Sequence, residues 1–198
     1  MPKQILIIHG GNTFPSHGAY LKHLENSPLD LEGLKRRQSW KSTLQEKLGP
    51  DFEVLQPRMP GSDDAVYGQW QTLFNRIIPL LNEEVILIGH SLGGAFLAKY
   101  LVENDFYKKI TALILIAAPT NEELEPLGEF KPRRTFRALN RKAEKIYLLY
   151  SQDDPVVPIS NLKEFQENIE KAKTIIFEDK GHFNQEEFPE LVKLIQSI

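Results

Sequence analysis

A serine stands between glycines at the junction of two apolar segments. Residues 86–97 read ILIGHSLGGAFL, in which Gly89, Ser91 and Gly93 form a G-x-S-x-G pattern. In that pattern a strand turns sharply into a helix, and the strained turn exposes the serine hydroxyl above a sheet. The sequence therefore predicts that Ser91 is a nucleophile. The alternative is a glycine-rich turn that carries an incidental serine.

A serine hydroxyl needs a general base to become an effective nucleophile, and the base needs an orienting carboxylate. His182, in FEDKGHFNQEEF, is the only histidine after Ser91, and it follows a glycine just beyond the last strand-like segment. The end of a strand is where a base for Ser91 would have to lie. We therefore predict that His182 is the base.

Two adjacent aspartates compete for the role of the orienting acid. The segment IYLLYSQDDPVVP places Asp153 and Asp154 after the penultimate strand-like segment, as the chain order serine, acid, histidine requires. We predict Asp154, because a proline-rich stretch bends the chain just after it, and keep Asp153 as the runner-up. The other aspartate is then a turn or capping residue. Glu122 or Glu123, after the preceding strand, is a further candidate.

Two backbone N–H groups are needed to stabilise the negative charge that develops on an attacked carbonyl oxygen. One is expected from Leu92, which directly follows the nucleophile. The other is expected from IIHGGN after the first strand, where Gly11 is the predicted donor and Asn12 the alternative. His9 and His90 are predicted to be structural residues that bond local backbone.

The remaining residue types indicate neither a metal nor a cofactor. His17 and His23 are expected to lie in a loop, and their spacing with His9 matches no metal site. The chain has no cysteine, which excludes disulfides, thiol nucleophiles and thiolate metal sites and fits a reducing compartment. The expected ligand is a small-molecule acyl substrate.

The elements that must position these residues alternate along the chain. Runs of consecutive apolar residues predict strands buried on both faces, at residues 4–9, 52–55, 85–88, 112–117, 146–150 and 174–177. Apolar residues at three-to-four spacing predict helices, at residues 39–48, 66–81, 92–104, 160–170 and 187–195. This alternation predicts an α/β fold with a mostly parallel sheet of about six strands and helices on both faces.

Two long stretches, residues 11–37 and 119–142, do not fit the alternation. Both follow strands, so both are predicted to lie as irregular connections at the carboxyl edge of the sheet, beside the site. Residues 131–142 carry six cations and no acid. We interpret them as a solvated mobile cover, balanced by the upstream Glu122, Glu123, Glu125 and Glu129, rather than as a nucleic-acid patch.

Two interpretations are open for four aromatic residues, Trp40, Trp70, Phe74 and Phe96. They could line an acyl pocket, but their helical spacing favours core positions for most of them.

Global properties set limits on the class of protein. The chain has 198 residues and a formal charge of −3, with 41% hydrophobic and 26% charged residues, which is typical of one soluble globular domain. The apolar run at residues 5–8 is too short for a signal peptide or a membrane span. We expect a cytoplasmic protein with no nucleic-acid or membrane partner. The sequence carries no signal for an oligomeric state.

Four short segments together carry a family resemblance: HGG after the first strand, GHSLGG, DDPVVP and GHF. They resemble an α/β-hydrolase and, more narrowly, the small serine hydrolases of the retinoblastoma-binding protein 9 and YdeN type. The resemblance spans residues 5–195. It implies a serine-hydrolase fold without a large cap domain and a triad at Ser91, Asp154 and His182. Residues 11–37 are longer than such a minimal domain is expected to have.

The combined prediction is a single α/β-hydrolase domain at residues 1–198 that cleaves a small ester or related acyl bond through an acyl-enzyme intermediate. The alternative is a catalytically weak or inactive hydrolase scaffold that acts as a protein-interaction module. The same triad would also serve thioester, amide or carbon–carbon bond hydrolysis, and the sequence does not choose among these bonds.

Overall fold

The structure, a computed structural model, describes residues 2–35, 38–121 and 126–198. One six-stranded sheet has the order β2-β1-β3-β4-β5-β6, and every neighbouring pair is parallel. The strands are β1 (Lys3–Ile8), β2 (Phe52–Leu55), β3 (Glu84–His90), β4 (Lys109–Ile116), β5 (Ala143–Ser151) and β6 (Lys173–Phe177). The predicted strands and the parallel sheet are confirmed.

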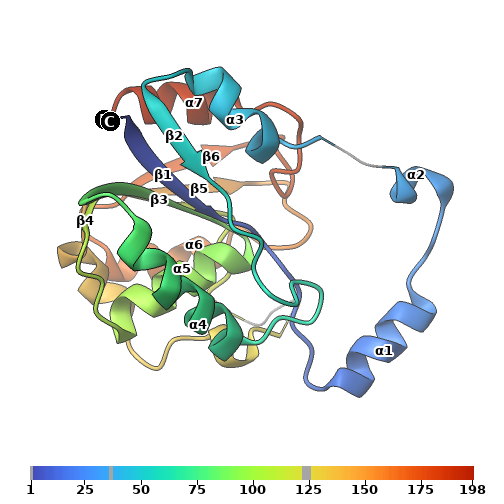
Figure 1. The fold of residues 1–198 in the computed structure, drawn as a ribbon. Helices are drawn as coiled ribbons and strands as arrows, with labels where there is room; N and C mark the ends of the chain where they lie inside the picture. The colour runs from blue at the N-terminus through green and yellow to red at the C-terminus, as the bar shows by residue number, and fades with distance from the viewer. Residues whose placement is uncertain (1, 36–37, 122–125) are drawn as a thin grey trace.

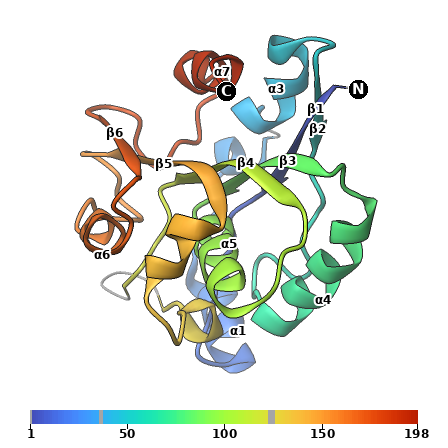
Figure 2. The same cartoon turned by 90° about the vertical axis from the view of Figure 1, so that its left-hand side faces the viewer.

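Helices cover both faces of the sheet (Figures 1 and 2). On one face lie α3 (Trp40–Leu48) and α7 (Pro189–Gln196), and on the other lie α4 (Tyr67–Ile77), α5 (Leu92–Glu103) and α6 (Asn161–Asn168). The predicted helix at residues 66–81 ends early as α4 and continues as the short 3-10 helix η1 (Ile78–Leu80). No helix within the described ranges is long and apolar enough to cross a membrane.

The central helix α5 is buried on nearly all sides, which explains why its sequence is apolar all round rather than amphipathic. It packs against β3 on one side and against the segment that precedes β5 on the other. Its one buried cation, Lys99, donates to the carbonyl of Lys131 over 3.0 Å and lies 3.5 Å from the Glu103 carboxylate. A paired cation can stay inside the fold because its charge is compensated.

The order of the strands explains where a ligand can bind. The chain leaves β1 toward β2 on one side, and then returns to place β3, β4, β5 and β6 on the other side of β1. This reversal opens a crevice beyond the carboxyl ends of β1 and β3, which is where open α/β sheets bind ligands. Residues 9–11 and Ser91 follow those two strand ends.

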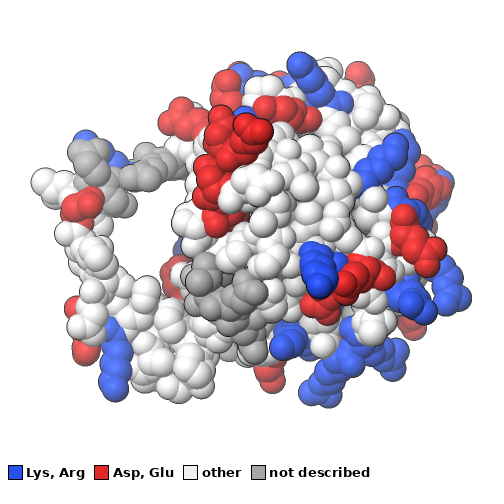
Figure 3. All heavy atoms as spheres, turned by 180° about the vertical axis from the view of Figure 1, so that it is seen from behind, with Lys and Arg blue, Asp and Glu red and all other residues white. Residues whose placement is uncertain are grey.

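The first long connection is not an irregular loop. It contains α1 (His17–Asn26) and α2 (Leu31–Leu34), which stand away from the body of the molecule as a projecting arm (Figures 1 and 3). The prediction that His17 and His23 lie in a loop is therefore wrong, because both belong to α1. No residue of α1 is buried, and its apolar residues Leu21 and Leu24 are exposed, so this helix does not pack an apolar face against the body of the protein.

The second long connection is anchored rather than freely solvated over its described part. It contains the 3-10 helices η2 (Gly128–Phe130) and η3 (Phe136–Arg141), and the side chains of Phe130, Phe136 and Leu139 are fully buried. The Thr13 hydroxyl of the first connection donates to the carbonyl of Pro126. The two connections therefore meet. Glu122, Glu123 and Glu125 lie outside the described residues.

Gly93 is the tightest point of packing between α5 and β1. A Cβ atom at this position would lie 2.2 Å from the carbonyl oxygen of Ile8 and 2.5 Å from that of His9. Both are backbone atoms of β1 and its extension, so they cannot move aside without disturbing the sheet. Gly93→Ala should therefore lower the free energy of unfolding by about 3 kcal/mol, a typical cost of overpacking a core.

The matched control is Gly68→Ala in α4, where a Cβ atom would meet nothing within 4 Å. This change should raise the free energy of unfolding by about 1 kcal/mol, because alanine is the better helix former. Urea unfolding followed by circular dichroism measures both variants. Equal unfolding midpoints for the two would contradict the packing argument.

Candidate active site

Ser91 lies in a strained turn between β3 and α5. Its backbone has φ 55° and ψ −129°, a conformation that costs a non-glycine residue about 1–3 kcal/mol and persists mainly at functional sites. Its N–H group donates to the carbonyl of Ile116 over 2.8 Å. A Cβ atom at Gly89 would lie 2.6 Å from Gly94 Cα. The close approach that the G-x-S-x-G pattern predicts is therefore present.

His182 lies in the loop after β6, with its imidazole between Ser91 and Asp154. Its Nε2 is 2.9 Å from Ser91 Oγ, and its Nδ1 is 2.9 and 3.0 Å from the two carboxylate oxygens of Asp154. A carboxylate only accepts hydrogen bonds, so Nδ1 carries the proton and Nε2 is free to accept from the serine hydroxyl. The three side chains form one continuous hydrogen-bonded line.

Backbone contacts distinguish the two candidate aspartates. Asp154 Oδ1 accepts hydrogen bonds from the N–H groups of Val156 and Val157, over 2.8 and 2.9 Å, and the Asp154 side chain is 1% exposed. Asp153 is exposed. Its carboxylate accepts from the Ser151 hydroxyl and from the Gly181 N–H. These two bonds, the Ser151 bond first, lower the pKa of Asp153.

Asp154 is thus the aspartate that contacts His182, while Asp153 has the turn role. The other acid candidates, Glu122 and Glu123, lie outside the residues that the structure describes.

Two side chains hold the backbone of the His182 loop. The indole of Trp40 donates to the carbonyl of Phe183 over 2.8 Å, and His90 Nε2 donates to the carbonyl of His182 over 2.8 Å. Burial, followed by the nearby charge of Lys41, lowers the pKa of His90 well below its usual value. His90 therefore stays neutral and keeps a single donor for this bond.

The two histidines predicted to bond local backbone differ in their partners. His9 does so, because its Nδ1 lies 2.6 Å from the carbonyl of Gly10, and its Nε2 accepts from the Met59 N–H over 2.8 Å. The prediction is wrong for His90, whose partner, His182, is far along the chain. Local sequence could not reveal that bond, because the fold alone brings the two loops together.

The backbone amides near Ser91 include two without a competing acceptor. No hydrogen-bond acceptor for the N–H groups of Gly11 and Leu92 is recorded within the described ranges. The N–H of Asn12, the alternative donor, already donates to the carbonyl of Ser62 over 2.8 Å. The geometry therefore favours Gly11 over Asn12 as a donor to a bound oxygen.

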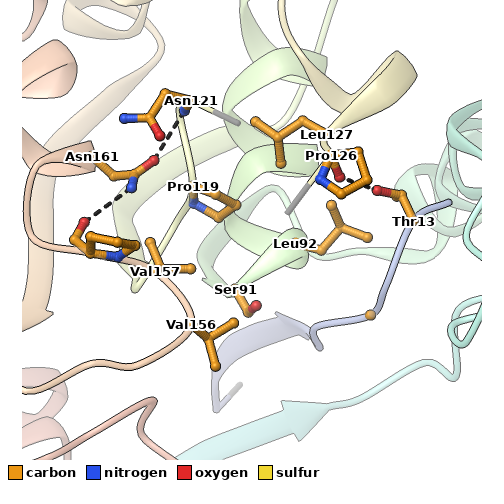
Figure 4. A pocket seen from close by; sticks show the side chains of 12 residues that line it. Thr13, Ser91, Leu92, Pro119, Asn121, Pro126, Leu127, Val156, Val157 and Asn161 are labelled. Carbon is orange, nitrogen blue, oxygen red and sulfur yellow. Dashed lines mark hydrogen bonds between the residues drawn. The ribbon is translucent and has the colours of Figure 1, made fainter. Parts of the chain in front are cut away.

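A small pocket, which we call the apolar pocket, opens on one side of Ser91 (Figure 4). Its walls come mainly from aliphatic and proline side chains on the loops that follow β1, β4 and β5. The lining residues are Gly11, Thr13, Ser91, Leu92, Pro119, Asn121, Pro126, Leu127, Val156, Val157, Pro158 and Asn161.

The aromatic candidates do not line the apolar pocket. Trp40, Trp70, Phe74 and Phe96 are buried in the core, as their spacing favoured. Asn161 links two segments of the pocket wall. Its side chain accepts from the N–H of Asn121 over 3.0 Å and donates to the carbonyl of Pro158 over 3.0 Å.

A second pocket, which we call the polar pocket, opens on the His182 side of Ser91. It is lined by His9, Gly10, Gly11, Asn12, Lys41, Ser62, Asp63, His90, Ser91, Val156, His182 and Asn184. Lys41 was not predicted as a site residue. It lies on α3, far along the chain from the loop after β1, and no motif near it in the sequence signals a ligand.

A parallel sheet with this strained serine turn, followed by an aspartate loop and a histidine loop in that order, defines an α/β-hydrolase. The crystal structure of the ydeN gene product from B. subtilis has the same fold, with a TM-score of 0.76 over 98% of this chain and 97% of that one, at 22% identity. A family model described as serine hydrolase matches residues 31–195, and the chain belongs to that family.

Two curated relatives indicate more narrowly which type of serine hydrolase the chain is. It is 29% identical to the serine hydrolase RBBP9 of Rattus norvegicus over 153 residues, which cover 75% of this chain and 79% of the relative. It is 25% identical to YdeN of Bacillus subtilis over 197 residues, which cover 94% of this chain and 89% of the relative. The chain is a small serine hydrolase of the RBBP9 and YdeN type, as the sequence motifs predicted.

Proposed function

We propose that this hydrolase cleaves a small ester or related acyl bond, with Ser91 as nucleophile, His182 as general base and acid, and Asp154 as the orienting carboxylate. The observation that carries the proposal is the continuous hydrogen-bonded line from Asp154 through His182 to Ser91, with both of its contacts at 3.0 Å or less. That line favours catalysis over an inactive scaffold, which has no need of an aligned base.

In the first half of the reaction, His182 Nε2 takes the proton from Ser91 as the serine oxygen bonds to the substrate carbonyl carbon. The electron pair of the carbonyl double bond moves to its oxygen, to which, in this proposal, the N–H groups of Gly11 and Leu92 donate. Collapse of this intermediate breaks the bond to the leaving group, which receives the proton from His182. An acyl group remains on Ser91.

In the second half, His182 activates a water molecule in the same way. The water oxygen bonds to the acyl carbon, and its proton goes to Nε2. Release of the carboxylic acid then breaks the bond to Ser91, which regains the proton from His182. Asp154 accepts the Nδ1–H bond throughout and stabilises the imidazolium that forms twice in each cycle.

The apolar pocket favours a small acyl group. Its wall combines aliphatic and proline side chains with polar residues, of which Thr13 and Asn161 already form hydrogen bonds, and the Thr13–Pro126 bond joins the two long connections. A short apolar acyl chain would bury its surface there without leaving polar wall groups unpaired. Between an ester and an amide, the ester is proposed because its leaving alkoxide needs less stabilisation than the leaving amine of an amide.

Labelling with a fluorophosphonate probe tests the proposal, because the probe reacts with activated serines and releases fluoride. Intact mass and peptide mapping should find one probe on the Ser91 peptide of the wild-type protein and none on Ser91→Ala. A panel of chromogenic esters, thioesters and amides then ranks the bonds. A folded wild-type protein that takes up no probe would refute the nucleophile and favour the interaction module.

A further inference from the structure

The polar pocket contains a cation that the proposed triad does not use. Lys41 lies at the start of α3, partly buried, with its ammonium 4.7 Å from the centre of the Trp40 ring. It lines the same pocket as Ser91 and His182. Its charge is close enough to His90, which directly precedes Ser91, to help keep that histidine neutral.

The ammonium of Lys41 has no counterion among the residues that the structure describes. Burial alone lowers the pKa of Lys41, to about 8, and no neighbouring carboxylate opposes the shift. Asp63 also lines the polar pocket, but it forms no ion pair with Lys41. At pH 7 Lys41 is therefore a partly desolvated cation that an anionic ligand would stabilise.

The proposed mechanism determines which part of the substrate meets this cation. His182 must deliver its proton to the leaving-group oxygen, so the leaving group lies on the His182 side of Ser91. His182 lines the polar pocket and is not part of the wall of the apolar pocket. The acyl group is therefore assigned to the apolar pocket and the leaving group to the polar pocket, beside Lys41.

We propose that the preferred substrates are esters of a small apolar acid whose leaving alcohol or phenol carries a carboxylate, and that Lys41 binds this carboxylate. The inference rests on the proposed function, because that function supplies the direction of the leaving group. Lys41 lies away from the reacting bond, so it should strengthen binding of the substrate and of the transition state alike.

The test compares 4-acetoxybenzoate with its neutral analogue 4-acetoxybenzamide at pH 7, together with the corresponding 3-substituted pair, which presents the carboxylate at a different distance. The wild-type protein should favour the carboxylate of at least one pair by about tenfold in kcat/KM, a typical value for a charge-assisted bond. The preference should lie in KM rather than in kcat.

The variants isolate the charge of Lys41. Lys41→Met keeps an unbranched stem against Trp40 and should bring the ratio of kcat/KM for the two esters to about one, whereas Lys41→Arg should keep a preference for the carboxylate. The matched control is Lys3→Met, whose ammonium also lies over an aromatic ring, 5.8 Å from the centre of Phe52, at the opposite edge of the sheet. It should keep the wild-type ratio.

An unchanged ratio in Lys41→Met would overturn the inference, and so would a wild-type protein that hydrolyses both esters equally well. Failure of the proposed function looks different, since neither ester would then be hydrolysed and Ser91 would take up no fluorophosphonate. In that case the carboxylate site is tested by calorimetry, which compares the affinity of the wild-type protein for the products 4-hydroxybenzoate and 4-hydroxybenzamide. Equal affinities would refute the carboxylate site, and this comparison needs no variant that might fail to fold.

Discussion

Replacing Ser91 with alanine should lower kcat for a hydrolysed ester by about 10⁶, the scale of loss when the nucleophile of a serine triad is removed. The Ser91 hydroxyl is the only nucleophilic group within hydrogen-bond distance of His182 Nε2, at 2.9 Å, among the described residues. Without it no acyl-enzyme forms, and water would have to attack directly. Stopped-flow kinetics should lose both the initial burst of product and the steady-state rate.

The variant should remain folded, because the turn does not depend on the hydroxyl. The Ser91 N–H bond to Ile116 and the close approach of Gly89 to Gly94 involve backbone alone. Ser197→Ala, whose hydroxyl donates to the carbonyl of Leu194 in the last turn of the chain, is the control for loss of a serine. Residual activity above a hundredth of wild type in a pure Ser91→Ala preparation would identify another nucleophile.

Replacing Asp154 with asparagine should lower kcat by about 10⁴ with little change in KM, which is the loss expected when a Ser-His-Asp triad loses its carboxylate. The N–H groups of Val156 and Val157 both require an acceptor at the Oδ1 position. In the wild-type protein His182 Nδ1 lies 2.9 Å from Asp154 Oδ2. An asparagine would keep its oxygen at the Oδ1 position and present its NH₂ group to His182 Nδ1. The imidazole then moves its proton to Nε2 and can no longer accept from Ser91.

The neighbouring aspartate provides the matched control. Asp153→Asn should keep kcat within about tenfold of wild type, because an amide oxygen can still accept the bonds from Ser151 and Gly181. Initial rates on one ester, with circular dichroism to confirm folding, compare the two variants. A larger loss in Asp153→Asn than in Asp154→Asn would reverse the assignment of the acid.

The arrangement of the main strands and helices was predictable because buried elements require apolar residues at regular spacing along the chain. The apolar run before Gly89 and the apolar segment after it allow only a strand and a helix that are buried on both sides, and the structure contains β3 and α5 there. The projecting arm was missed for the same physical reason. The helix α1 buries no residue, so burial imposes no extended apolar pattern on its ten residues.

For the candidate site, the amino-acid sequence is enough to show which residue types follow which strands. A serine in a glycine-rich turn, an aspartate pair and a late histidine are local features, and parallel strands bring their carboxyl ends to one edge of the sheet. The structure brings Ser91, His182 and Asp154 together at that edge.

The choice between the two aspartates, and the contacts between the site and its surroundings, depend on how the chain folds. Asp153 and Asp154 have the same chemistry and adjacent positions, and they differ only in which backbone N–H groups and which imidazole the folded chain brings to each. His90 likewise gains its partner from a distant part of the chain, and Lys41 lines a pocket with Ser91 and His182, from which it is far apart in the sequence. Hydrogen bonds and desolvation act over a few ångströms in space, and the order of residues along the chain does not contain those distances.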